Sequence, residues 1–118
     1  MIQLVPQMRI LLATEPVDFR NGIDGLAAKC RTVLKEDPFS GMLFVFANRR
    51  RTAVKILSYD GTGFWMCMKR LSRGKFRWWP ARGGESAARI AAAELQILLV
   101  NGDPVRANLG EVWRKISA

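Results

Sequence analysis

Two β-prone runs separated by a four-residue turn constrain the fold of this chain most strongly. The runs TAVKILSY (52–59) and FWMCMKRL (64–71) flank the turn DGTG (60–63). Glycine adopts the positive φ angles that tight turns need and aspartate favours turns, so the pattern predicts a β-hairpin. Alternation in the second run places its even-numbered residues on one face and its odd-numbered residues on the other.

Further extended segments surround this hairpin. The apolar run MLFVFA (42–47) suits a central strand that is covered on both faces. The segment KFRWWP (75–80) reads as a short extended piece that Pro80 ends. We therefore expect an antiparallel meander of three or four strands over about residues 42–79, with an additional N-terminal strand at MRILLA (8–13).

Helical patterns lie on either side of the meander. A helix capped by Asp18 or Asn21 is expected to run to about Glu36, because its apolar residues recur at three-and-four spacing. Good helix formers predict a second helix over 91–101, and Asp103-Pro104 resembles the start of a third. The prediction is a single α+β domain over residues 1–118, with helices packed on one face of a small sheet and a mobile loop at 81–88.

Several kinds of protein are disfavoured by what the sequence lacks. It contains no histidine and two cysteines far apart, so neither a structural zinc site nor the usual nucleophile–base pair is expected. No apolar run approaches the roughly 20 residues of a membrane helix, and the start lacks a basic leader. We expect a cytoplasmic protein with no metal, no cofactor and no membrane contact.

Positive charge is concentrated in one third of the chain. The net charge is +9, and residues 1–48 and 90–118 each contain equal numbers of acidic and basic residues. Residues 49–89 hold eleven cations against two anions, which accounts for the entire excess. Segregation of this kind is typical of a surface that contacts a polyanion.

If the meander is correct, alternate turns project from the same edge and bring two basic segments together. Arg49, Arg50 and Arg51 occupy one turn, and the cations of 73–77 lie at or beyond the next. Phe76 and Trp78 share a strand face and are expected in the core, which leaves Trp79 as the aromatic residue that could stack on bases. The candidate nucleic-acid-binding residues are Arg49, Arg50, Arg51, Lys69, Arg70, Arg73, Lys75, Arg77, Trp79 and Arg82.

The chain also resembles a known family over about residues 8–80. The resemblance rests on ordered motifs: VDFRNGIDGLAA (17–28), DPFSG with LFVF (37–46), the arginine run (49–51), KIL with DG (55–61), KRLSRGKF with WP (69–80), and later ELQILL (94–99). These resemble the TnpB accessory proteins, which are encoded by the second open reading frame of bacterial insertion sequences of the IS66 type. The chain departs from the family at Ser58-Tyr59, where paired tryptophans are usual, and residues 102–118 fall outside the resemblance.

The resemblance implies a role in transposition beside a separate transposase that carries the catalytic residues. It implies no catalytic residue here, and it suggests transposon DNA as the polyanion. The first hypothesis is therefore a non-catalytic accessory protein that binds DNA backbone and assists the transposase. The alternative is an adaptor whose basic surface meets the transposase or a host factor without touching DNA.

A third hypothesis, a metal-dependent nuclease, would need Asp18, Asp24 and Asp60 to hold an ion. Asp18 is explained as a helix cap, Asp24 as a charge that favours the start of a helix dipole, and Asp60 as a turn residue. We therefore do not expect an enzyme. The sequence leaves open the oligomeric state, any DNA sequence preference, and whether single or double strands are bound.

Overall fold

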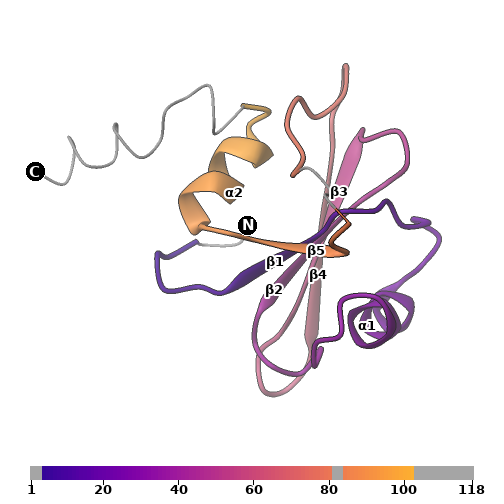
Figure 1. Cartoon of the computed structure of the whole chain (residues 1–118), viewed down its shortest axis with the longest axis vertical. Helices are drawn as coiled ribbons and strands as arrows, with labels where there is room; N and C mark the ends of the chain where they lie inside the picture. Colours follow the sequence, from indigo (N-terminus) through magenta and orange to yellow (C-terminus); the bar gives the residue numbers. More distant parts are fainter. Residues whose placement is uncertain (1–3, 81–83, 103–118) are drawn as a thin grey trace, which may run out of the picture.

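A computed structural model describes residues 4–80 and 84–102 as a five-stranded sheet with two helices (Figure 1). The sheet order is β4-β3-β2-β1-β5, in which β1 and β2 are parallel and every other neighbouring pair is antiparallel. This architecture confirms the α+β class. The elements in chain order are β1 (Ile10–Ala13), α1 (Ile23–Thr32), β2 (Leu43–Ala47), β3 (Ala53–Tyr59), β4 (Phe64–Arg70), β5 (Ala87–Ile90) and α2 (Ala92–Leu99).

The two helices lie on opposite faces of the sheet, so the expectation that they share one face is wrong (Figure 1). On one face, α1 packs its Leu26 and Cys30 in a cluster with Phe44 of β2. On the other face, α2 packs Leu95 in a cluster with Val45, the next residue of the same strand. Because every residue of β1 and β2 is buried, each face of the central sheet needs its own cover.

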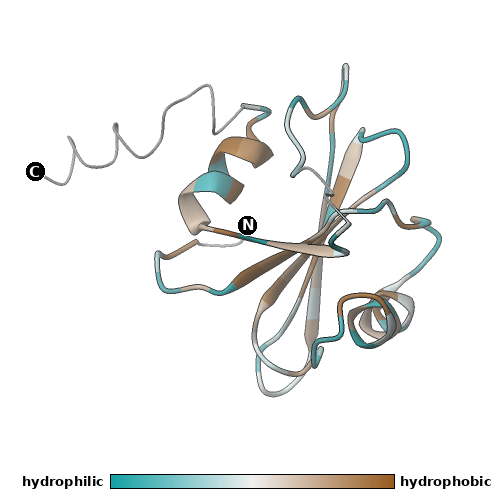
Figure 2. Ribbon diagram, viewed as in Figure 1, coloured by the Kyte–Doolittle hydropathy of each residue, from teal (hydrophilic) through white to brown (hydrophobic). Residues whose placement is uncertain are grey.

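The central strands form a β–α–β unit, which explains the single parallel pair. The chain leaves β1, passes through α1 and returns in β2 beside β1, with Leu11 in register with Phe44. Parallel neighbours need a crossover of this length, whereas two antiparallel strands can be joined by a short turn. Figure 2 shows the apolar residues concentrated on these central strands and the polar residues in the surrounding turns.

Helix α1 is shorter than expected and is not capped by either predicted residue. Its N-cap is Gly22, which makes no side-chain cap hydrogen bond, and its C-cap is Val33 rather than a residue near Glu36. Instead of capping, Asp18 accepts hydrogen bonds from the backbone and side chain of Arg20. The predicted second helix is confirmed as α2, whereas the third predicted helix lies outside the described residues.

The hairpin of β3 and β4 is confirmed, and the chain beyond it differs from the prediction. Residues 71–80 form no strand, so the meander has three strands and ends at Arg70. Ala87 and Ala88, which were expected in a loop, begin β5 and pair with β1. No helix in the described part of the chain is long and apolar enough to cross a membrane.

Candidate nucleic-acid interface

The turn between β2 and β3 presents Arg49 and Arg50 to solvent. Its shape is fixed by Asn48, whose Oδ1 accepts hydrogen bonds from the backbone N–H groups of Thr52 at 2.9 Å and Ala53 at 3.2 Å. The Asn48 Nδ2 also donates to the Thr52 hydroxyl at 2.9 Å. An asparagine that closes a turn through its own side chain holds the backbone between the strands in one conformation. The two arginines therefore project from a defined turn.

Arg51 differs from the two arginines before it, because it is half-buried. Its φ angle is 58°, in the left-handed region, and its guanidinium carbon lies 5.6 Å from the centroid of the Trp79 ring. Guanidinium groups at this distance from an indole face are attracted by the ring quadrupole. Arg51 thus connects the turn to the core.

The chain that leaves β4 comes back against this turn. The backbone N–H of Leu71 donates to the Thr52 carbonyl at 2.9 Å, and the N–H of Phe76 donates to the Arg51 carbonyl at 2.8 Å. These bonds hold the loop 71–77 beside the arginine turn. The two basic segments that the sequence placed at one edge are therefore neighbours in the structure.

Asn101, just beyond α2, fixes the far side of the same loop. Its Oδ1 accepts a hydrogen bond from the Arg77 N–H at 2.8 Å, and its Nδ2 donates to the Lys75 carbonyl at 3.2 Å. Asn101 has a φ angle of 64°, a conformation that asparagine tolerates better than most residues. No sequence pattern pointed to this residue, because its partners lie 24 and 26 positions away.

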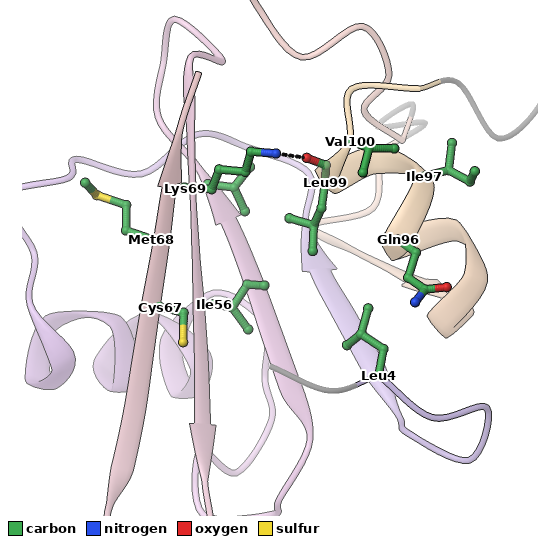
Figure 3. A pocket seen from close by; sticks show the side chains of 10 residues that line it. Leu4, Ile56, Cys67, Met68, Lys69, Gln96, Ile97, Leu99 and Val100 are labelled. Carbon is green, nitrogen blue, oxygen red and sulfur yellow. Dashed lines mark hydrogen bonds between the residues drawn. The ribbon is translucent and has the colours of Figure 1, made fainter. Parts of the chain in front are cut away.

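Lys69 is exposed, but its ammonium is already engaged within the protein. Its Nζ donates a short hydrogen bond to the carbonyl of Leu99 at the C-terminal end of α2 (Figure 3). A cation at this position interacts favourably with the unpaired carbonyls and the negative end of the helix dipole. Both residues line an apolar groove of about 580 Å³ between α2 and the outer half of the sheet.

Trp79 is buried, with 9% of its surface exposed, so the expectation that it is available for stacking is wrong. Its Nε1 donates to the Ala13 carbonyl at 3.0 Å. Phe76 is buried, as predicted, and Trp78 is half-buried against the same core. The prediction of an exposed Trp79 assumed a strand, but residues 71–80 form none, so their side chains do not alternate between two faces. Arg82 lies outside the described residues.

Lys55 lies in the basic segment of residues 49–89, but its side chain belongs to the interior of the protein. It is 6% exposed, and its Nζ donates to the carbonyls of Phe19 at 2.9 Å and Asn21 at 2.8 Å. The ammonium also lies 4.9 Å from the centroid of the Phe19 ring. Its charge stabilises the loop before α1 and is not available to an external polyanion.

Six cations remain exposed on the two adjacent turns and at the end of β4 that leads into the second turn, and we call them the basic turn surface. Their side chains form no salt bridge or hydrogen bond with other described residues. Among the described residues, the one salt bridge joins Arg20 to Asp18. The members of the basic turn surface are Arg49, Arg50, Arg70, Arg73, Lys75 and Arg77.

A mixed polar hollow of about 370 Å³ lies beside this surface, between residues 16–19 and 48–50. Its carboxylate, Asp18, is bound by Arg20 through a 2.6 Å contact, and the hydrogen bond from that guanidinium lowers the pKa of Asp18 to about 2. The anion nearest to the arginine turn is therefore already paired. Arg20 itself is 92% exposed and adds a further cation at this end of the hollow.

The carboxylates considered for metal binding do not converge. Among the described residues, no three His, Cys, Asp or Glu side chains are grouped so that they could hold a metal ion. Asp60 closes the β3–β4 turn by accepting hydrogen bonds from the backbone N–H groups of Thr62 and Gly63 and from the indole of Trp65. These donors, led by the Thr62 N–H, hold the pKa of Asp60 well below its ordinary value. Its position has a structural explanation.

Comparison with known proteins gives one family and two curated relatives. The family model described as IS66 Orf2 like protein matches residues 8–108. The uncharacterized protein y4jC of Sinorhizobium fredii (strain NBRC 101917 / NGR234) is 36% identical over 107 residues, covering 91% of this chain and 90% of the relative. The uncharacterized protein y4hO of the same strain is 41% identical over 92 residues, covering 78% of each. No solved structure matches the chain.

Proposed function

Because the chain belongs to the IS66 Orf2-like family of insertion-sequence accessory proteins, we propose that it serves transposition by binding DNA through the basic turn surface. In this proposal the protein is not the catalyst. It holds the sugar–phosphate backbone of the element and assists a separate transposase.

The observation that carries the proposal is the set of six exposed cations, of which Arg70 ends β4 and the other five lie on two turns that are hydrogen-bonded to each other. Each phosphate that a cation neutralises releases condensed counterions and contributes about −0.9 to the slope of log K against log salt. If all six contact phosphates of a duplex, the slope should approach about −5. Because the turns are already ordered, binding costs less conformational entropy than it would for a flexible basic tail.

The geometry favours backbone contact over the reading of bases. The cations lie on two turns and on the last residue of β4, at one end of the strands, and neither described helix contributes a residue to the basic turn surface. Sequence readout requires side chains that reach base edges in a groove, most often from a helix or a β-ribbon. The burial of Trp79 also removes the aromatic residue predicted to stack on unpaired bases. We therefore expect similar affinity for unrelated duplex sequences.

The test is binding of labelled duplexes, one from the element's end and one scrambled, across a salt series. The double variant Arg49→Ala/Arg50→Ala should lower affinity at low salt and reduce the magnitude of the slope by about 1.8. The matched control is Arg9→Ala/Arg89→Ala, which removes two exposed cations from outside the basic turn surface. The control should keep the wild-type slope if position matters, and equal losses in both variants would refute the assignment.

The adaptor hypothesis is the other outcome of the same experiment. If the wild-type protein binds neither duplex at low salt, the basic turn surface is assigned to an acidic face of the transposase instead. Pull-down of the transposase after nuclease treatment then tests this contact, because a DNA bridge would be lost and a direct contact would remain.

A further inference from the structure

Strand β4 is an edge of the sheet that the described residues form, and one of its two hydrogen-bonding sides pairs with no described strand. The bond from the Leu71 N–H to the Thr52 carbonyl and the bond from the Asp60 N–H to the Gly63 carbonyl fix the pattern of the β3–β4 ladder. Hydrogen-bonded and non-hydrogen-bonded pairs alternate along an antiparallel ladder, so the odd-numbered residues of β4 bond to β3. The even-numbered residues of β4 therefore direct their N–H and C=O groups outward, where no described strand pairs with them.

This edge also exposes large apolar side chains. Trp65 is 62% exposed and Met68 is 58% exposed, on opposite faces of the same strand. Natural edge strands are commonly protected by charged side chains, proline, a bulge or a short length. Strand β4 is seven residues long, contains no proline and carries its two cations, Lys69 and Arg70, at one end. The part of the edge from Phe64 to Met68 therefore has none of these protections and is suited to pairing with another strand.

We propose that β4 pairs with β4 of a second copy of this chain, antiparallel and centred on Cys67, so that two sheets join into one. The proposal does not rest on DNA binding, and Arg70 is the residue that it shares with the basic turn surface. Because the outward groups belong to even-numbered residues, hydrogen-bonded pairs across the new ladder must join even to even. Of the registers that satisfy this, the one centred on Cys67 pairs all seven residues of the strand.

The side chains of β4 complement each other in this register. Trp65 lies opposite Lys69 of the second copy, and Phe64 lies opposite Arg70 of the second copy, so each cation meets an aromatic ring. Met66 lies opposite Met68 of the second copy, and the two Cys67 residues face each other. A parallel arrangement in register would instead place lysine beside lysine and arginine beside arginine, which is unfavourable.

The pairing also extends the apolar groove between α2 and the outer strands. Cys67 and Lys69 line the groove from β4, and Val100 lines it from the end of α2 (Figure 3). Trp65 shares the α2-facing side of the sheet with these two β4 residues, because odd-numbered residues of the strand point the same way. In the paired assembly, Trp65 of the second copy lies beside Lys69 at the border of the groove. The exposed Trp65 side chain of one copy thus meets the border of the apolar groove of the other copy.

The first measurement is sedimentation equilibrium of the full chain without DNA, over a range of micromolar concentrations. The wild-type protein should form dimers. Met68→Pro removes an N–H that points away from β3, so the monomer should keep its fold, which circular dichroism checks. Dimerisation should weaken about tenfold or more, because the pair loses one interstrand hydrogen bond from each copy. A wild-type protein that stays monomeric up to the highest concentration would overturn the proposal.

Cysteine cross-linking tests the register directly and does not depend on the proline variant folding. In the proposed pair, the two Cys67 residues occupy a non-hydrogen-bonded site with Cα atoms about 4.5 Å apart, within the range of a disulfide. Mild oxidation should therefore give a disulfide-linked wild-type dimer. Cys30 is buried in the core and should not contribute.

The matched control moves the cysteine by two positions, in Trp65→Cys/Cys67→Ser. Its two engineered cysteines would be separated by about 14 Å along the strand, too far for a disulfide, so cross-linking should be at least about tenfold slower than in the wild type. Mixing this variant with Lys69→Cys/Cys67→Ser should restore rapid cross-linking, because those positions face each other. Equal rates for the wild type and the control alone would show dimers formed by another surface or by collision, and would overturn the proposal.

Discussion

Replacing Lys55 with methionine separates a structural cation from the cations proposed to bind DNA. The Lys55 ammonium makes two hydrogen bonds, to the Phe19 and Asn21 carbonyls, and is 6% exposed. Hydrogen bonds that involve a charged group contribute about 1.5 kcal/mol or more each, so their loss costs about 3 kcal/mol. The methionine side chain recovers about 1 kcal/mol because it is apolar and needs no desolvation of a charge. We expect Lys55→Met to lower the free energy of unfolding by about 2 kcal/mol.

Urea denaturation followed by tryptophan fluorescence measures this loss. With the urea dependence of a small domain, a change of about 2 kcal/mol corresponds to a midpoint lower by about 1 M. The matched control is Lys75→Met, because Lys75 is exposed and its side chain makes no hydrogen bond or salt bridge with another described residue. A surface substitution of this kind should change the free energy of unfolding by less than about 0.5 kcal/mol.

The same two variants should behave in the opposite way in DNA binding. Lys55→Met should keep the wild-type salt slope, whereas Lys75→Met should reduce its magnitude by about 0.9. The reasoning would be refuted if Lys55→Met left the urea midpoint unchanged, because the ammonium would then be solvated in the folded state. It would also be refuted if Lys55→Met reduced the salt slope as much as Lys75→Met.

Three further predictions concern other parts of the molecule. Hydrogen bonds led by that from Thr62 lower the pKa of Asp60 from 3.8, so the stabilisation by its carboxylate is present above about pH 4 and is lost as the pH falls further. In Asp60→Asn, the urea midpoint should therefore fall less between neutral and acid pH than it does in the wild type. Ellman's reagent should modify Cys67 in the native monomer and Cys30 only in denaturant, because burial raises the pKa of the Cys30 thiol from 9.0 to about 12. Asn101→Gly keeps the left-handed backbone but loses both side-chain bonds to the loop, so affinity for the labelled duplexes should fall about threefold to tenfold with no change in salt slope.

The parts of the fold that depend on local signals could be predicted from the sequence. The DGTG turn, with Asp60 at its first position, defines the β3–β4 hairpin within a few residues, and the apolar run of β2 indicated a strand covered on both faces. Strand β5 could not be found in this way. It is the short segment AARI beside a glycine pair, it has little intrinsic β-propensity, and it is a strand because β1 pairs with it from more than 70 positions away.

The adjacency of the two basic segments was predictable from the sequence, whereas the surroundings of particular residues in them were not. Charge segregation and the hairpin were enough to place two basic turns at one edge. The roles of Lys55, Lys69 and Trp79 depend on carbonyl partners that lie 36, 30 and 66 positions away. Such partners leave no local pattern, so the sequence reading placed Lys69 and Trp79 among the candidate DNA-binding residues although both are engaged within the protein.

The division of the basic third into engaged and exposed cations bears on what the surface is for. Charge that only keeps a protein soluble can lie on turns of any shape, and ordering those turns costs conformational entropy without return. Here Asn48 fixes one turn and Asn101 fixes the neighbouring loop, although neither side chain belongs to the apolar core. Fixed geometry is useful where several charges must meet a partner with its own regular spacing, as the phosphates of a duplex have. The two asparagines therefore support binding, rather than solubility, as the role of the basic turn surface.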